Sequence, residues 1–283
     1  MKTPVAEQQI ASPVGGSFSL AAEIARLYRY RQLIVTLTAR DLKARYRGSV
    51  LGFFWSLANP LMLLGVYTLV FTKFFPRPDI EPYALFLFCG ILPWTFFSGS
   101  IMETTTSISS NAGLVKKVMF PAEALPLVVV FSHLVHFALA LPILLGAALL
   151  SALLEKTHLG LAILAVPVVM LLQTMFIAGL ALAISSASVL FRDLRDLVAN
   201  LMQLGFFLTP IIYSLSAVPS RGIRALLMLN PMTPFVVAYQ RIFFEGRLPG
   251  TSETVLMLFY AFGSLILGFI VFDRLRDSLA EAI

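Results

Sequence analysis

The chain has 283 residues, of which 58% are hydrophobic and only 13% are charged, and its mean hydropathy is +0.87. A soluble domain carries about a quarter charged residues, so the composition excludes a soluble globular protein and indicates one membrane domain with several spans. The net charge of +6 is interpreted as a membrane-surface feature and not as a nucleic-acid site. The single cysteine, Cys89, supports neither a disulfide framework nor a metal cluster, and we expect no catalytic or metal site in this chain.

The N-terminal part divides into a tail and a helix. Residues 1–18 are polar and lack the apolar stretch of a cleaved signal, so we expect a disordered tail. Residues 19–47 are expected to form an amphipathic helix with its apolar side chains on a broad arc and most basic side chains opposite, although Arg31 and Arg45 break this pattern. Two placements stay open, namely the lipid headgroup layer or the surface of a partner subunit.

Long apolar segments predict an all-α integral membrane fold with six spans. They lie near residues 53–75, 84–103, 124–150, 159–186, 197–217 and 254–272. The fifth is the most polar, and Pro60 and Pro210 predict kinks in the first and fifth spans. Residues 218–252 are too long for a simple turn, and their apolar stretch at 235–244 is too short to cross. We place the transmembrane domain at 48–276 and a short tail at 277–283.

Charge placement predicts the orientation. With the N-terminus inside, the inner segments hold most of the 21 Lys and Arg residues, so the positive-inside rule places both termini in the cytoplasm.

Polar and small residues inside the spans predict helix packing. His133 and His136 lie one turn apart, without a carboxylate in the same span, and we expect neutral histidines that hydrogen-bond between helices, not metal ligands. Gly179, Ala183 and Ala187 are spaced by four, which is typical of a close helix contact.

Several motifs in unbroken order carry a family resemblance. They are RYRGSVLGFFWSLANP at 45–60, NAGLVKKVMFPAEALP at 111–126, FRDLRDLVANLMQLGFFLTPIIYS at 191–214 and NPMTPFVVAYQRIFFEG at 230–246. Together they resemble the permease subunit of ABC-2-type exporters of cell-surface polysaccharides, which include O-antigen, capsule and teichoic-acid exporters.

The resemblance implies a homodimer in a bacterial plasma (inner) membrane, with short re-entrant outer helices before each last span. Two copies of a separate ATP-binding-cassette ATPase would dock on the cytoplasmic face, and the cargo would be a polysaccharide or lipid-linked glycan. The sequence contains no G-x-x-x-x-G-K-[ST] loop to cradle phosphates. We therefore expect no cofactor in this chain, with ATP and Mg bound by the partner subunit.

The resemblance also assigns roles to three groups of residues. The loop between the second and third spans matches the coupling element, with ATPase-coupling residues Leu114, Val115, Lys116 and Lys117; the alternative is an ordinary hairpin loop. The cytoplasmic gate would use Arg40, Arg45, Arg47, Arg192, Asp193 and Arg195; the alternative is a set of solvated charges. Aromatic rings stack on sugar faces, which assigns conduit lining to Trp55, Asn59, Tyr67, Phe71, Phe207 and Tyr213; the alternative is an aromatic belt at the membrane interface.

Other functions stay open as alternatives. An ABC-2 permease for a small lipid or drug would share the span count. An integral-membrane lipid-sugar transferase would need clustered carboxylates at one face, whereas Asp79 and Glu81 are expected outside and Glu103 and Glu123 inside. A secondary transporter is disfavoured because no inverted repeat is evident.

Overall fold

The computed structural model describes residues 28–45, 47–48, 54–75, 80–116, 120–191 and 193–282, without the side chains of residues 56, 277 and 279–282. The expected tail at 1–18, the first part of the expected helix at 19–47, Lys117 and Arg192 lie outside the described residues. Within the described ranges every regular element is a helix, which confirms the predicted all-α class.

Five segments of the described chain are long and apolar enough to cross a membrane. They belong to α3 (Trp55–Leu69) with η2 (Val70–Phe74), α4 (Tyr83–Ser107), α6 (Ala124–Leu153), η4 (Leu161–Ala165) with α7 (Val166–Leu190), and α11 (Thr251–Ala282). Helices form here because lipid offers no partner to backbone N–H and C=O groups. Five of the six predicted spans coincide with these segments to within a few residues, and residues 277–282 extend α11.

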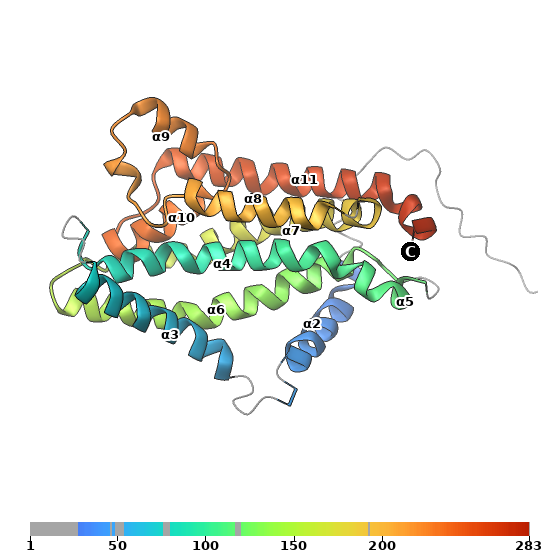
Figure 1. Cartoon of the computed structure of the whole chain (residues 1–283), viewed down its shortest axis with the longest axis horizontal. Coiled ribbons are helices and arrows are strands. Elements are labelled where there is room, and N and C mark those ends of the chain that lie inside the picture. Colours follow the sequence, from blue (N-terminus) through green and yellow to red (C-terminus); the bar gives the residue numbers. More distant parts are fainter. Residues whose placement is uncertain are drawn as a thin grey trace, which may run out of the picture.

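The long helices form a bundle with two distinct ends (Figure 1). At one end α4 leads into α5 (Ala112–Val115), and α7 leads into α8 (Leu194–Leu208). We call this the basic end, since Lys116, Arg195 and Arg276 lie there. At the other, distal end α3 leads into α4 and α6 leads into α7.

The fifth predicted span differs from expectation because α8 has only 15 residues, about 22 Å at 1.5 Å per residue. Thr209 has an extended backbone with ψ 137°, as expected for the residue before a proline. The helix therefore ends before Pro210, where we predicted a kink.

Side chains from other helices satisfy the irregular backbone that follows α8. The Tyr83 hydroxyl donates to the carbonyl of Ile212 at 2.6 Å, and the Gln240 amide donates to the carbonyl of Pro210 at 2.8 Å. Tyr83 begins α4 at the distal end. Consequently α8 and this irregular segment together run from the basic end to the distal end.

The segment before α11 folds back onto the bundle. It forms α9 (Arg221–Met228), α10 (Thr233–Gln240) and η6 (Arg241–Glu245). All eight residues of α10 are buried, and the helix contacts α4, α7 and α11. The apolar stretch that we predicted to be too short to cross is therefore covered by protein along α10. In contrast, α9 projects from the bundle (Figure 1) and exposes Ile223 and Leu226.

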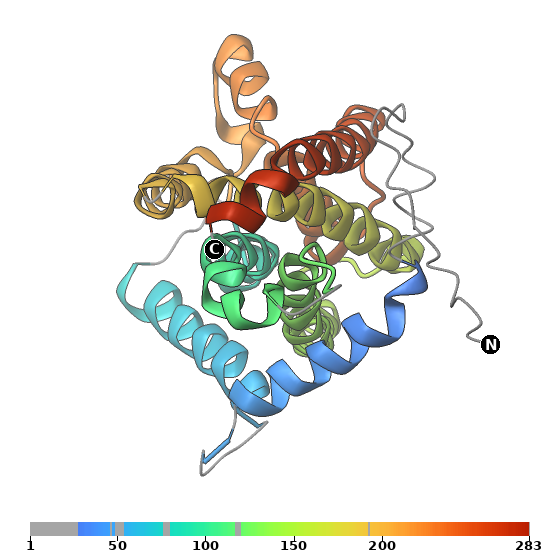
Figure 2. The same ribbon diagram turned by 90° about the vertical axis from the view of Figure 1, so that its right-hand side faces the viewer.

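Helix α2 (Arg31–Arg45) runs across the long helices and packs on α6 (Figures 1 and 2). It buries Ile34 and Thr38, whereas Val35 is exposed. The buried face is narrower than the broad apolar arc that the sequence suggested, and a place in the headgroup layer stays a prediction.

Helix α4 is the centre of the bundle. The span in α4 is 78% buried, whereas the span that includes α3 is 0% buried. Aromatic pairs join α4 to α6 and α7, with ring centroids 5.2 Å apart for Phe96 and Phe137 and 5.7 Å apart for Phe97 and Phe176. Helix α3 therefore lies at the edge of the chain and presents an apolar surface.

Helices α7 and α11 make the most extensive contact in the bundle. A Cβ atom at Gly179 would overlap the backbone of Ser264, and one at Gly268 would overlap the carbonyl of Gly179. The small residue at Gly179 is thus what allows the two backbones to touch, in agreement with the predicted packing stripe.

This contact predicts that Gly179→Ala lowers stability, because its Cβ atom must push α11 away. We expect a loss of about 1–3 kcal/mol, which is typical of overpacking, measured as a lower thermal unfolding midpoint in detergent. The matched control is Gly263→Ala on α11, whose Cβ atom meets nothing within 4 Å. Equal midpoints for the two variants would contradict the packing role of Gly179.

Candidate functional site

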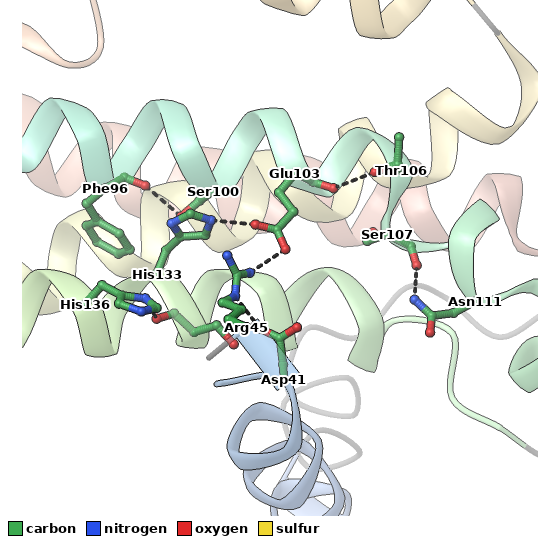
Figure 3. A network of polar contacts seen from close by, with 11 residues as sticks. Asp41, Arg45, Phe96, Ser100, Glu103, Thr106, Ser107, Asn111, His133 and His136 are labelled. Atoms are coloured by element: carbon green, nitrogen blue, oxygen red, sulfur yellow. Dashed lines mark hydrogen bonds and ion pairs between the residues drawn. The ribbon is translucent and has the colours of Figure 1, made fainter. Parts of the chain in front are cut away.

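A polar network joins three helices near the basic end (Figure 3). Arg45, at the end of α2, donates from Nε to Asp41 Oδ2 at 2.9 Å and from Nη2 to Glu103 Oε1 on α4. The other carboxylate oxygen of Glu103 accepts from His133 Nε2 on α6 at 2.9 Å. Arg45 thereby links α2 to α4 by a bond between two side chains.

The side chains of the network are partly buried and partly exposed, and this intermediate exposure determines how strong their ion pairs are. Side chains of Arg45, Glu103 and His133 are 27%, 37% and 19% exposed. Burial alone would lower the pKa of Arg45, but the carboxylates of Glu103 and Asp41 accept its hydrogen bonds and raise that pKa above its usual value. A carboxylate inside an apolar span is costly without a partner, so Arg45 and His133 make the charge of Glu103 tolerable there.

Neighbouring residues on α4 and α6 determine the space and the hydrogen bonds around the two histidines. A Cβ atom at Gly99 would lie 2.8 Å from His133 Cε1, so the glycine leaves room for the imidazole. His136, one turn further along α6, bonds through Nδ1 to the carbonyl of Ser132 at 2.8 Å. The predicted interhelical hydrogen bond is therefore confirmed for His133, and its partner is a carboxylate from another span.

Only part of the predicted gate set comes together. Arg45 enters the network, while Arg40 and Arg47 are exposed. Asp193 and Arg195 are also exposed, at the start of α8, and no ion pair between described residues involves them. Sequence reasoning noted that Arg45 breaks the pattern of its helix, but it missed Glu103, whose signal is a lone carboxylate near the end of an apolar span.

The predicted coupling loop is a short helical surface element at the basic end. It contains η3 (Ser109–Asn111) and α5, and the Asn111 amide donates to the carbonyl of Ser107 at 2.8 Å. Val115 packs against the core of its own chain, whereas Leu114 is half-buried and Lys116 is exposed. Leu114 and Lys116 are therefore the described coupling residues that a partner could reach.

The predicted conduit residues fall into two groups. Tyr67 and Phe71 pack inward, and Phe71 lies edge-on to Tyr83 of α4 at a centroid distance of 4.5 Å. Trp55, Asn59 and Phe207 are exposed, and the half-buried Tyr213 donates its hydroxyl to the carbonyl of Phe207 at 3.3 Å. Leu63 and Leu64 of α3 also pack against the core, and α3 contacts both α4 and α6.

Two apolar helix faces remain uncovered in the chain. Both α3 and α8 flank α4 on the same side of the bundle (Figure 2). Large apolar side chains more than half exposed lie along them: Leu61, Met62, Val66 and Leu69 on α3, and Leu197, Leu201, Leu204, Phe207 and Leu208 on α8. Faces of this extent on a single chain indicate an interaction surface or contact with lipid.

A hollow of about 570 Å³ lies between α4 and α8 on that side. Trp94, Met102, Gln203 and Phe206 line it, and the rings of Trp94 and Phe206 are 6.0 Å apart. A Cβ atom at Gly205 would lie 3.0 Å from the indole ring of Trp94. The glycine therefore leaves room for this ring. Sequence reasoning missed Trp94, because an aromatic residue in an apolar span carries no local signal of the face it occupies.

Comparison with known proteins gives consistent matches over nearly the whole chain. A family described as ABC-2 type transporters matches residues 32–244. An O-antigen export system permease protein RfbA of Myxococcus xanthus is 38% identical over 261 residues, which are 92% of this chain and 98% of that protein. A protein of the same name from Klebsiella pneumoniae is 30% identical, covering 88% of this chain and 94% of its own. The polysialic acid transport protein KpsM of Escherichia coli is 23% identical over 84% of this chain and 90% of its own.

The network predicts energetic coupling between Arg45 and Glu103. In a cycle of Arg45→Ala, Glu103→Ala and the double variant, we expect a coupling energy of about 1 kcal/mol, since partly exposed pairs seldom exceed this value. Amide hydrogen exchange within α2 should become several-fold faster in each single variant.

Arg40→Ala provides the control, because Arg40 is exposed on the same helix. Its α2 exchange should stay at the wild-type rate. Additive effects of the two network substitutions would show that Arg45 does not hold α2 through Glu103.

Proposed function

Because the chain belongs to the ABC-2 type transporter family, we propose that it is the membrane permease of an ATP-driven exporter of a cell-surface polysaccharide in a bacterial inner membrane. The observation that carries this proposal is the similarity to O-antigen export permeases along 98% and 94% of their lengths. The multi-pass helical fold agrees with it. The cargo class is a glycan such as O-antigen or capsule polysaccharide, carried on a lipid.

We propose that the basic end faces the cytoplasm, and with it both termini. Described basic residues are dense there, on α2, α5, α8 and the end of α11: Arg40, Lys43, Arg45, Lys116, Arg195, Arg274 and Arg276. The positive-inside rule supports this orientation. The distal end then faces outward, where α10 would close the path as a helix buried in protein.

The energy source is proposed to be a separate subunit. The chain has no phosphate-binding glycine loop, so two ATP-binding-cassette subunits would hold ATP and Mg, and this chain would carry no cofactor. The α5 element, with Leu114 and Lys116 at the surface, is the proposed docking point. Closure of the ATPase would move it and, through the start of α6, tilt the bundle.

The uncovered faces of α3 and α8 are proposed to meet a second copy. Burying these apolar side chains between two copies would remove them from lipid or water and leave α4 facing a shared path. Trp55, Asn59 and Phe207 are exposed on the two helices, and aromatic rings there suit sugar faces. Trp94, in the hollow between α4 and α8, joins this proposed lining.

The Arg45 network is proposed to latch the cytoplasmic entrance. Helix α2 crosses α6 beside the start of α3 (Figure 2). Release of the bonds from Arg45 to Glu103 would free α2 and α3 together. A lipid-linked glycan could then enter sideways from the inner leaflet while its lipid stays in the bilayer.

Transport by the purified complex tests the function. The chain and its ATPase are placed in vesicles with a radiolabelled lipid-linked O-antigen on the outside, cytoplasmic face. We expect ATP-dependent protection of the glycan from an added glycosidase, and none with the ATPase alone.

Two results would point elsewhere. Elongation of the glycan by the chain without ATPase would favour the transferase alternative. ATP-driven movement of short lipids, with no movement of the long glycan, would favour the small-lipid or drug alternative.

The coupling proposal predicts that Leu114→Asp weakens binding of the ATPase. A carboxylate in an apolar cleft loses its hydration without gaining a partner, and we expect a cost of about 2 kcal/mol, as for a central interface residue. Affinity of the ATPase for the permease in nanodiscs measures it. Val115→Asp is unsuitable because Val115 packs against its own core.

Leu248→Asp is the matched control, since Leu248 is an exposed leucine at the distal end. Its ATPase affinity should equal that of the wild type. Unchanged affinity in Leu114→Asp would mean that the loop is only a connector between α4 and α6.

A further inference from the structure

A large apolar cavity lies on the flank of the bundle between α3, α6 and the start of α4. Its volume is about 1020 Å³, at the top of the range of about 300–1,000 Å³ for small-molecule sites. The walls are mostly aliphatic and aromatic: Leu61, Leu64, Phe71, Leu85, Ile143, Ala147, Leu150 and Leu154. None of the residues of the Arg45 network lines it.

The depth of the cavity matches one leaflet of a bilayer. Along α3 its lining runs from Leu61 to Thr72, and along α6 from Ile143 to Leu154. Both distances are roughly 16 Å at the helical rise of 1.5 Å per residue, about half of the 30 Å hydrocarbon layer. The cavity begins at the distal end and stops near the middle of the membrane, as an acyl chain does.

The polar groups in the walls do not suit a sugar. The hydroxyls of Thr68 in α3 and Thr72 in η2 donate to the carbonyls of Leu64 and Thr68. Among described residues the Ser151 hydroxyl has no hydrogen-bond partner, and Ser151 is only 6% exposed. A single free hydroxyl among apolar walls fits a lipid with one ester group at that depth better than a chain of sugars.

Both signs of charge occur at the mouth of the cavity. Lys156 Nζ and Glu81 Oε1 are 2.8 Å apart, and their side chains are 45% and 66% exposed. The hydrogen bond from Lys156 lowers the pKa of Glu81, so the Glu81 carboxylate stays ionised at neutral pH. A phosphate could bind Lys156 while an ammonium binds Glu81, whereas a lipid diphosphate would be repelled by Glu81.

We propose that this cavity binds one zwitterionic phospholipid of the phosphatidylethanolamine type, with an acyl chain between α3 and α6 and the headgroup on Lys156 and Glu81. The lipid fills the space beside α3, whose span has no buried residue of its own. Its presence therefore sets how firmly α3 rests on the bundle. This inference requires only that the chain spans a membrane and is independent of the glycan.

Filling the cavity tests the acyl-chain part. Gly146 lines the cavity, and a Cβ atom there meets nothing within 4 Å, so Gly146→Leu occupies the space without a backbone clash. Native mass spectrometry of the full chain with added phosphatidylethanolamine should show one retained lipid per chain, reduced at least tenfold in this variant. Gly263→Leu makes the same change where a Cβ atom also meets nothing, and it should retain the lipid. Equal retention in both variants would overturn the proposal.

Exchanging charges tests the headgroup part. Glu81→Gln should shift the preference from phosphatidylethanolamine to anionic phosphatidylglycerol by about twofold to fivefold, as for an exposed ion pair. The double variant Glu81→Lys with Lys156→Glu restores both signs and should restore the preference for phosphatidylethanolamine. A preference unchanged in Glu81→Gln would overturn the headgroup assignment.

Crosslinking of the wild-type chain keeps the test independent of folding of the variants. A phosphatidylethanolamine with a photoreactive acyl chain should label peptides from α3 and from residues 143–154 of α6. Labelling confined to other peptides would overturn the proposal. Displacement of the label by a polyprenyl diphosphate, but not by unlabelled phosphatidylethanolamine, would assign the cavity to the lipid carrier instead and equally overturn it.

Discussion

The satisfaction of backbone polar groups inside the membrane is the constraint on which the rest of the structure depends. Where the helices are continuous, each N–H and C=O pairs within its own helix. At Pro210 this is impossible, and the carbonyls of Pro210 and Ile212 accept hydrogen bonds from Gln240 and Tyr83 instead. These two donors require α10 and the start of α4 to meet the irregular segment at one point. The buried position of α10 therefore follows from the break in α8, and the two features form one unit.

A charged side chain inside an apolar helix also needs polar partners, and here other side chains supply them. Glu103 lies in an apolar helix, and its carboxylate is tolerated because Arg45 and His133 reach it from α2 and α6. The result is a three-helix junction made by side chains that are partly open to solvent. Such a junction is stable enough to position α2 and weak enough to be opened by movement of the helices around it. These properties suit the lateral entrance that we propose.

Helices α3 and α8 are less covered by the rest of the chain than the other long helices. Each leaves one apolar face uncovered, and they flank α4 on one side of the bundle. Helix α3 is held on its inner side by Phe71 against Tyr83 and leaves a cavity toward α6. In our proposals its position depends on contacts outside the chain, with a second copy on one side and with lipid on the other. A helix held in this way can move without disturbing the core around α4.

The sequence by itself determined five of the long apolar helices, because the length of an apolar run is a local property matched to the thickness of the bilayer. It also carried the motifs of the family in order along the chain. It determined that Arg45 is out of place on its helix, but the partner Glu103 lies far away in the sequence, and only the tertiary structure brought the two together. The inward packing of Tyr67 and Phe71 and the cavity beside Ser151 were likewise decided by contacts between helices. Hydropathy records how apolar a residue is, whereas the face it occupies depends on which distant helix packs against it.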